Sequence, residues 1–227
     1  MIQKALIFDS GALISLTMAG LIPELEGLKK SFSGKFVITR QVKKELVDKP
    51  MTIKRFELEA IKIQHLIDDK ILEIPEAFGI SDSEIQKEMN FFLDLANNTF
   101  TTQKGPVKLI HFGESSCLAL SKILSEKGVE NIIAVDERTT RLLAEKPENL
   151  RKLMEKKLHM PISVKKENYK FFENFKIIRS TELIYVAYKK GIVRFKKGDV
   201  LDALLYALKF NGAAISGDEI REIKRIG

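Results

Sequence analysis

Four acidic side chains, each at the end of a predicted strand or on a helix that follows one, carry the clearest chemistry in this sequence. Asp9 ends the apolar run Ala5 to Phe8, and Asp136 ends the apolar run Ile132 to Val135. Short continuous apolar runs are typical of strands buried in a parallel sheet, and ligands bind outside the carboxyl ends of such strands. We therefore expect Asp9 and Asp136 to lie at one edge of a sheet.

Two glutamates are expected on helices close to that edge. Glu114 lies in the first turn of a helix, directly after Gly113, and Glu45 lies near the apolar face of the predicted helix 41–47. Carboxylate oxygens are the preferred protein ligands of Mg²⁺ and Mn²⁺, and clustered carboxylates repel one another unless a divalent cation screens them. Such a site can activate a water and stabilise the oxygens of a phosphodiester displacement.

Each acid also has an ordinary structural interpretation. Asp9 can cap the next helix, and Glu114 is favoured in a first turn by the helix dipole. Glu45 can pair with a lysine. For a single acid these interpretations compete with a functional one, whereas the four acids together favour a site.

The elements that must position these acids alternate between strand-like and helix-like segments. Strands are expected at 5–8, 35–38, 71–74, 132–135 and 176–178. Helices are expected from 12 onward and at 21–28, 41–47, 81–96, 138–145, 181–190, 200–210 and 220–226, with one capped by Thr52 and one running from Phe112 to Gly128. The polar segment 97–106 is interpreted as a loop. This alternation predicts an α/β fold, a three-layer α/β/α sandwich with a central parallel sheet.

Length, net charge and cysteine content limit the class of protein that this sequence can be. The 227 residues suit one domain, 1–227, with a helical insertion at 52–105 and a Lys-rich insertion at 148–176. The formal charge of +7 indicates a polyanionic partner. Cys117 is the single cysteine, which excludes an internal disulfide, fits a reducing cytoplasm and is expected in the core. Charged Lys4 and Asp9 interrupt the first apolar run, so we expect neither a signal peptide nor a membrane span.

The segment Arg151 to Lys176 mixes lysines with aromatic residues. Basic residues among aromatics suit a single strand of nucleic acid, whose phosphates need cations and whose bases need stacking surfaces. The lysines expected to contact phosphates are Lys156, Lys157, Lys165 and Lys166. The competing interpretation is that Phe171, Phe172 and Phe175 form a buried helical face.

The motifs in order resemble the PIN domain family. They are Phe8-Asp9-Ser10, Glu45 within Val-Ile-Thr-Arg-Gln-Val-Lys-Lys-Glu-Leu, the block Gly113-Glu114-Ser115-Ser116-Cys117-Leu118-Ala119-Leu120, and Val135-Asp136-Glu137-Arg138. The likeness is greatest to the prokaryotic branch with a C-terminal helical extension, here 177–193 and 200–223. It implies a metal-dependent ribonuclease that cuts single-stranded RNA, often as a toxin paired with an antitoxin. By matching position, Asp9, Glu45, Glu114 and Asp136 are the implied metal-binding and catalytic acids. The sequence departs from the compact family pattern in its long 45–114 spacing and in the segment 148–176.

We therefore expect a cytoplasmic Mg²⁺- or Mn²⁺-dependent endoribonuclease, acting as a toxin or in RNA processing. The alternative is a catalytically weak PIN-like module that binds nucleic acid in an RNA-processing assembly. Expected partners are single-stranded RNA, an antitoxin or RNA-processing protein, and a second copy of the chain.

Three further patterns are weaker. Phe8 to Leu13 also resembles the opening of haloacid dehalogenase-type phosphatases, but Gly11 stands where their second Asp is needed. The three histidines are too widely spaced for a metal-ligand pattern. Asp218 follows a short apolar run, and we expect it or Ser216 to cap the terminal helix rather than to act in catalysis.

Overall fold

The computed structural model describes residues 3–196 and 198–226, and within them the chain forms a five-stranded parallel sheet in the order β3-β2-β1-β6-β8. The strands are β1 (Lys4–Phe8), β2 (Lys35–Val37), β3 (Leu72–Glu73), β6 (Glu130–Ala134) and β8 (Ile177–Ile178). Leu6 is paired with Phe36 on one side and with Ile132 on the other. The central position of β1 explains why its run is apolar, since a middle strand is covered on both faces.

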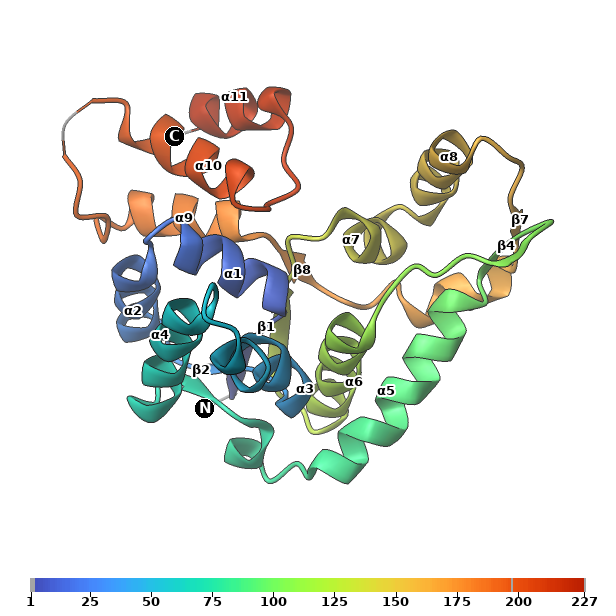
Figure 1. Ribbon diagram of the computed structural model, residues 1–227, viewed down its shortest axis with the longest axis horizontal. Helices are drawn as coiled ribbons and strands as arrows, with labels where there is room; N and C mark the ends of the chain where they lie inside the picture. The colour runs from blue at the N-terminus through green and yellow to red at the C-terminus, as the bar shows by residue number, and fades with distance from the viewer. Residues whose placement is uncertain (1–2, 197, 227) are drawn as a thin grey trace.

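Helices cover both faces of this sheet, as predicted (Figure 1). On one side α1 (Ser10–Met18) and α2 (Ile22–Ser31) contact α9 (Ser180–Lys189). On the other, α6 (Phe112–Glu126) packs on β1 and β6, and α5 (Asp82–Asn97) packs along α6. The arrangement is a three-layer α/β/α sandwich, as the alternation of strands and helices predicted.

The chain has further helical segments besides these. They are α3 (Arg40–Lys43), η1 (Lys44–Asp48), η2 (Pro50–Thr52), α4 (Glu57–Asp68), η3 (Pro75–Phe78), α7 (Arg138–Glu145), α8 (Pro147–Leu158), η4 (Lys166–Phe171), α10 (Val200–Phe210) and α11 (Gly217–Ile226). In the described part of the chain, no helix combines the length and the apolar character that crossing a membrane needs.

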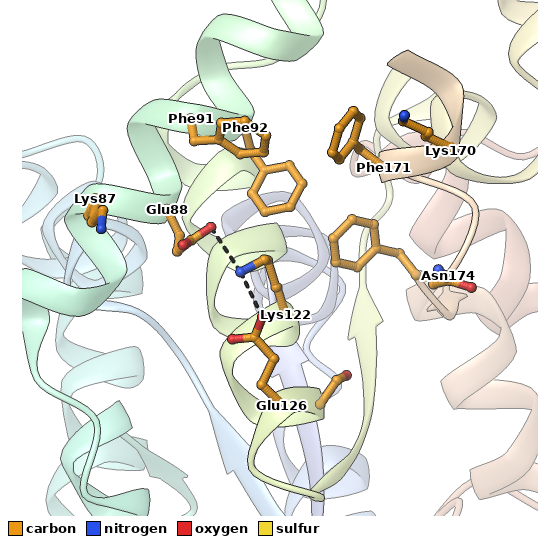
Figure 2. A pocket seen from close by; sticks show the side chains of 11 residues that line it. Lys87, Glu88, Phe91, Phe92, Lys122, Glu126, Lys170, Phe171 and Asn174 are labelled. Carbon is orange, nitrogen blue, oxygen red and sulfur yellow. Dashed lines mark ion pairs between the residues drawn. The ribbon is translucent and has the colours of Figure 1, made fainter. Parts of the chain in front are cut away.

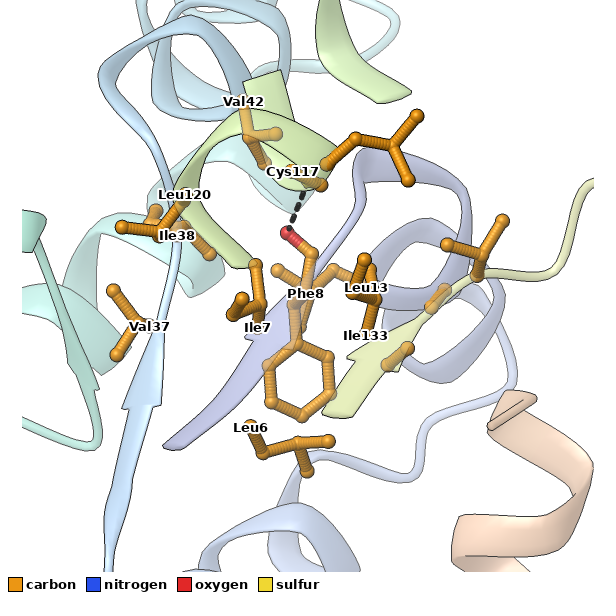
Figure 3. Packing of buried hydrophobic residues seen from close by; sticks show 14 of the residues in the cluster. Leu6, Ile7, Phe8, Leu13, Val37, Ile38, Val42, Cys117, Leu120 and Ile133 are labelled. Carbon is orange, nitrogen blue, oxygen red and sulfur yellow. Dashed lines mark hydrogen bonds between the residues drawn. The ribbon is translucent and has the colours of Figure 1, made fainter. Parts of the chain in front are cut away.

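The core is continuous around β1 (Figure 3). Phe8, Leu13 and Ile133 are fully buried, and burial of a side chain of this size stabilises the fold by about 1.5–3 kcal/mol. Cys117 is buried as expected, and its thiol donates a hydrogen bond of 3.6 Å to the Phe8 carbonyl. The contact joins α6 to the carboxyl end of β1.

The segment 97–106, interpreted from the sequence as a loop, begins with the last residue of α5 and contains a β-hairpin. β4 (Phe100–Thr102) pairs antiparallel with β5 (Gly105–Pro106), and β4 also pairs with β7 (Ser163–Val164). The hairpin closes at Gly105, whose φ of +114° suits only glycine. The loop prediction was wrong because β4 and β5 have only 3 and 2 residues, too few for a strand pattern, and the other partner of β4, β7, lies far along the chain.

The hairpin belongs to an arm in which the two segments predicted as insertions pack against each other. Phe92 of α5 contacts the rings of Phe172 and Phe175 at centroid distances of 6.0 and 5.4 Å. The expected buried helical face is only partly realised. Phe172 is 1% exposed, but Phe171 is 41% exposed and ends η4, a short 3-10 helix.

The helix expected to begin at Thr52 begins later, at Glu57. Pro50 starts the 3-10 turn η2, and the Thr52 hydroxyl donates to the Lys49 carbonyl at 2.7 Å instead of capping a helix. Phe56 directly precedes this helix and is 43% exposed.

Candidate active site

Asp9 is buried at the carboxyl end of β1, where it caps α1. Its Oδ2 accepts a hydrogen bond of 3.1 Å from the Gly11 amide, as the structural interpretation predicted. Its Oδ1 is buried and has no hydrogen-bond partner among the described residues. Capping therefore accounts for only one of the two carboxylate oxygens, and the other needs an explanation.

The pKa of Asp9 is raised to about 7. The main cause is burial, and the charges of Glu114 and Glu45 add to it, while the amides of Gly11 and Ser10 act in the opposite direction. Burial removes the water that would stabilise the carboxylate, and neighbouring carboxylates repel it. Two of the other expected acids, Glu114 and Glu45, thus act electrostatically on Asp9.

Glu45 is brought to Asp9 by the turn that follows β2. Thr39 caps α3 by accepting a hydrogen bond of 3.1 Å from the Val42 amide, and the helix then widens into the π-helical turn η1, which carries Glu45. Single π-helical turns are frequent at functional sites. Glu45 accepts a hydrogen bond of 2.8 Å from Gln41, four residues earlier, instead of pairing with a lysine.

Gly113 is the point where Asp9 and Glu45 meet. A Cβ atom on Gly113 would lie 2.7 Å from Oε2 of Glu45 and 3.3 Å from Oδ1 of Asp9. The unpartnered oxygen of Asp9 and one oxygen of Glu45 therefore face the same small space above the first turn of α6. Only glycine leaves that space open.

A chain of hydroxyl groups holds α6 against α3 at this point. The Ser116 hydroxyl lies 2.7 Å from the Gly113 carbonyl and 2.7 Å from the Thr39 hydroxyl. Since the Thr39 oxygen also accepts from the Val42 amide, the cap of α3 and the first turn of α6 are joined by buried hydrogen bonds.

Glu114 completes the first turn of α6. Its Oε2 accepts a hydrogen bond of 3.1 Å from the His111 amide, in the reciprocal arrangement known as a capping box. Its charge also raises the pKa of Asp9 and, together with the charges of Asp9 and Glu45, that of the buried Cys117 thiol, for which burial is the main cause. Glu114 thus serves as a helix cap and also lies near the other two acids.

Asp136 lies at the predicted edge of the sheet, but its carboxylate is hydrogen-bonded to Ser180. Phe8 is paired with Ala134, and the Asp9 amide donates to the Ala134 carbonyl at 3.0 Å, so Asp9 and Asp136 follow neighbouring strands. Both oxygens of Asp136 accept hydrogen bonds from Ser180, from the amide at 2.8 Å and from the hydroxyl at 2.7 Å. The structure thus brings Asp136 to the site's edge and binds it to the start of α9.

The carboxylates around Gly113 have the chemistry that a divalent cation requires. Within residues 3–196 and 198–226, no three His, Cys, Asp or Glu side chains are grouped closely enough to form a ready-made metal cage. The two oxygens at Gly113 nevertheless fit a hard cation, because one of them is buried without a partner and both belong to carboxylates. The residues present fit Mg²⁺ or Mn²⁺ as a two-carboxylate centre with Glu114 nearby.

Glu45 also lines an apolar groove of about 550 Å³. Ile14 and Met18 of α1, Phe56 and the 80% exposed Phe210 contribute most of its exposed apolar side chains.

The four lysines expected to contact phosphates all lie on the arm. Lys156 and Lys157 are in the last turn of α8, Lys165 follows β7, and Lys166 opens η4. All four are exposed, and Lys166 is paired with Glu148 at 3.0 Å. In Figure 1, α8 and β7 lie out on the arm to the right of α1 and α3, so the lysines on these elements are not part of the acidic site.

Two contributors to the site were not identified from the sequence. Gly113 was noted only as part of a motif, although the lack of a side chain is what makes the space. Ser180 was not named at all, and the available signal was its position directly after a predicted strand at the same edge.

Comparisons with protein-family models, with curated proteins and with solved structures find no match to this chain.

Proposed function

We propose that this chain is a metal-dependent endoribonuclease of the PIN type that cleaves single-stranded RNA. The observation that carries the proposal is the unpartnered, buried Oδ1 of Asp9, which faces Oε2 of Glu45 across Gly113. Repulsion among Asp9, Glu45 and Glu114 destabilises the ionised site, and a divalent cation relieves that repulsion. A structural cap alone would not require a second acid to face the buried oxygen.

Each residue has a distinct role in this proposal. Asp9 and Glu45 hold the cation, and Glu114 adds negative charge beside it while keeping α6 capped. When bound, a divalent cation supplies a water nucleophile at neutral pH and stabilises the negative oxygens of the scissile phosphate. Asp136, fixed by Ser180, positions the adjacent end of β6 and places a fourth charge at the edge.

Metal-dependent cleavage of an unstructured RNA tests the proposal. Wild-type protein should cleave with Mg²⁺ or Mn²⁺ and lose activity in EDTA, and Asp9→Asn and Glu45→Gln should each reduce the rate at least a hundredfold. Asp218→Asn is the matched control, because it removes an exposed carboxylate outside the site. Cleavage that persists in Asp9→Asn, or that proceeds equally in EDTA, would contradict the proposal.

A second function, RNA binding with little catalysis, is favoured by one specific observation. Both oxygens of Asp136 are occupied by Ser180, so the fourth acid is not turned toward Asp9 and Glu45. In that case the same RNA would be retained by the protein but recovered intact with either cation.

A further inference from the structure

The arm carries a groove of about 540 Å³ that is separate from the acidic site (Figure 2). Its walls come from α5, from the C-terminal half of α6, and from the end of η4 with the segment that follows it. Two of these walls belong to the segments predicted as insertions, 52–105 and 148–176. The third wall, α6, belongs to the sandwich. The groove therefore exists only because the insertions pack together.

Two phenylalanine rings remain at the groove's surface although their neighbours are buried. Phe91 is 43% exposed and Phe171 41% exposed, and their centroids lie 5.7 Å apart in an edge-to-face contact. Phe92, directly beside Phe91, is buried, and Figure 2 shows its ring among those of the groove. The buried rings account for packing of the arm, whereas the exposed faces of Phe91 and Phe171 are left for a ligand with flat surfaces.

The charges of the groove leave an excess of positive charge. Lys122 is paired with both acidic residues of the lining, Glu88 at 3.3 Å and Glu126 at 2.8 Å. Among the described residues, Lys87 and Lys170 have no carboxylate partner, and the Lys170 ammonium lies 5.2 Å from the centre of the Phe171 ring. Each exposed ring thus has an unneutralised cation close to it in sequence.

The groove and the acidic site lie at opposite ends of α6. In a helix of 3.6 residues per turn, Ser125 of the groove is about 17 Å along the axis from Glu114 and within ~20° of it around the axis. The residues of α6 that share this face between them, Leu118 and Ser121, are buried, so the groove and the acidic site are separate surfaces.

We propose that this groove is an accessory binding site for single-stranded RNA, in which bases stack on Phe91 and Phe171 and phosphates contact Lys87 and Lys170. Exposed aromatic faces beside free cations are what a single strand requires, since every base has a stacking face and every phosphate a charge. The inference rests on the proposed function for the identity of the ligand. It replaces the lysines selected from the sequence with two others that the fold places beside exposed rings.

The test measures binding without cleavage, using the Asp9→Asn protein in EDTA and a fluorescein-labelled oligouridylate. Phe91→Leu/Phe171→Leu keeps apolar volume but removes both rings, and we expect it to weaken binding by about 25-fold or more, because each of the two lost stacking contacts costs roughly 5- to 150-fold. Lys87→Ala/Lys170→Ala alters only exposed side chains, and should reduce the magnitude of the salt slope by about 1.4. An abasic strand of equal length should respond to the lysine change and not to the phenylalanine change.

Lys156→Ala/Lys157→Ala is the matched control, because it removes two exposed lysines of the same arm outside the groove. The proposal is overturned if this control flattens the salt slope while Lys87→Ala/Lys170→Ala does not. It is also overturned if Phe91→Leu/Phe171→Leu leaves RNA affinity unchanged but dissociates a dimer seen by light scattering. Since no cleavage is measured, absence of nuclease activity in the wild type would reject the proposed function and leave this test intact.

Discussion

A side chain on Gly113 would lie 2.7 Å from Oε2 of Glu45, so the acidic site depends on a glycine at the start of α6. We expect Gly113→Ala to displace the flexible Glu45 carboxylate and lower the affinity for Mn²⁺ at least tenfold. The backbone at Gly113 is helical, so the same change should leave the free energy of unfolding unchanged or raise it by up to about 1 kcal/mol. Calorimetric titration and urea unfolding separate the two effects. Gly217→Ala, which would meet only ordinary van der Waals contacts, is the control, and equal Mn²⁺ affinity in both variants would contradict the prediction.

The raised pKa of Asp9 predicts a specific dependence of stability on pH in the absence of metal. Since its pKa rises from 3.8 to about 7 on folding, the folded state favours protonated Asp9. Its stabilising contribution is complete below about pH 4 and is lost as the pH rises through about 7. Asp9→Asn removes this ionisation, so its stability relative to wild type should increase across that range. Urea unfolding in EDTA at several pH values measures the difference in stability between Asp9→Asn and the wild type. A difference that does not change with pH would show that the pKa of Asp9 is not raised.

Divalent cations should stabilise the wild type through the same carboxylates. A ligand present at a hundred times its Kd stabilises the folded state by about 2.7 kcal/mol, which appears as a rise in Tm. We expect Mn²⁺ to raise the Tm of the wild type and of Asp218→Asn, and to have little effect on Asp9→Asn or Glu45→Gln. A similar rise in all four proteins would place the cation somewhere else.

Ser180→Ala tests the connection between Asp136 and α9. The change removes the 2.7 Å hydrogen bond to a buried carboxylate and keeps the backbone donor. Because hydrogen bonds to charged groups contribute about 1.5–3 kcal/mol, a loss of stability of that order is expected in urea unfolding. Ser33→Ala, in the exposed turn before β2, should change stability by less than about 0.5 kcal/mol. An equally small effect at Ser180 would mean that Asp136 does not depend on it.

We expect Asp218, at the start of the C-terminal helix, to take no part in catalysis. Ser216 accepts a hydrogen bond of 3.1 Å from the Glu219 amide and so caps α11, while Asp218 is exposed and pairs with Arg221. Ser216→Ala should cost about 1 kcal/mol of stability, and Asp218→Asn should cleave RNA at the wild-type rate. A nuclease defect in Asp218→Asn as severe as that in Asp136→Asn would reverse this assignment.

Local patterns in the sequence determined the layers of this fold and the edge at which its acids gather. The apolar runs that end at Asp9 and Asp136 predicted two strands, and the structure pairs these strands directly. The cap at Thr39 likewise formed where it was expected. Such features were predictable because burial on both faces and the capping of a helix depend on residues close together in the chain.

Only the tertiary structure decided how the side chains of these elements are oriented and which surfaces remain exposed. Asp136 turns to Ser180, 44 residues away, because two donors there satisfy its buried carboxylate. Glu45 faces Asp9 because Gly113, from a third part of the chain, leaves room for it. Phe171 and Phe91 share a groove because distant segments pack together. A carboxylate or a ring takes its direction from its spatial neighbours, and in this protein those neighbours lie far apart in the sequence.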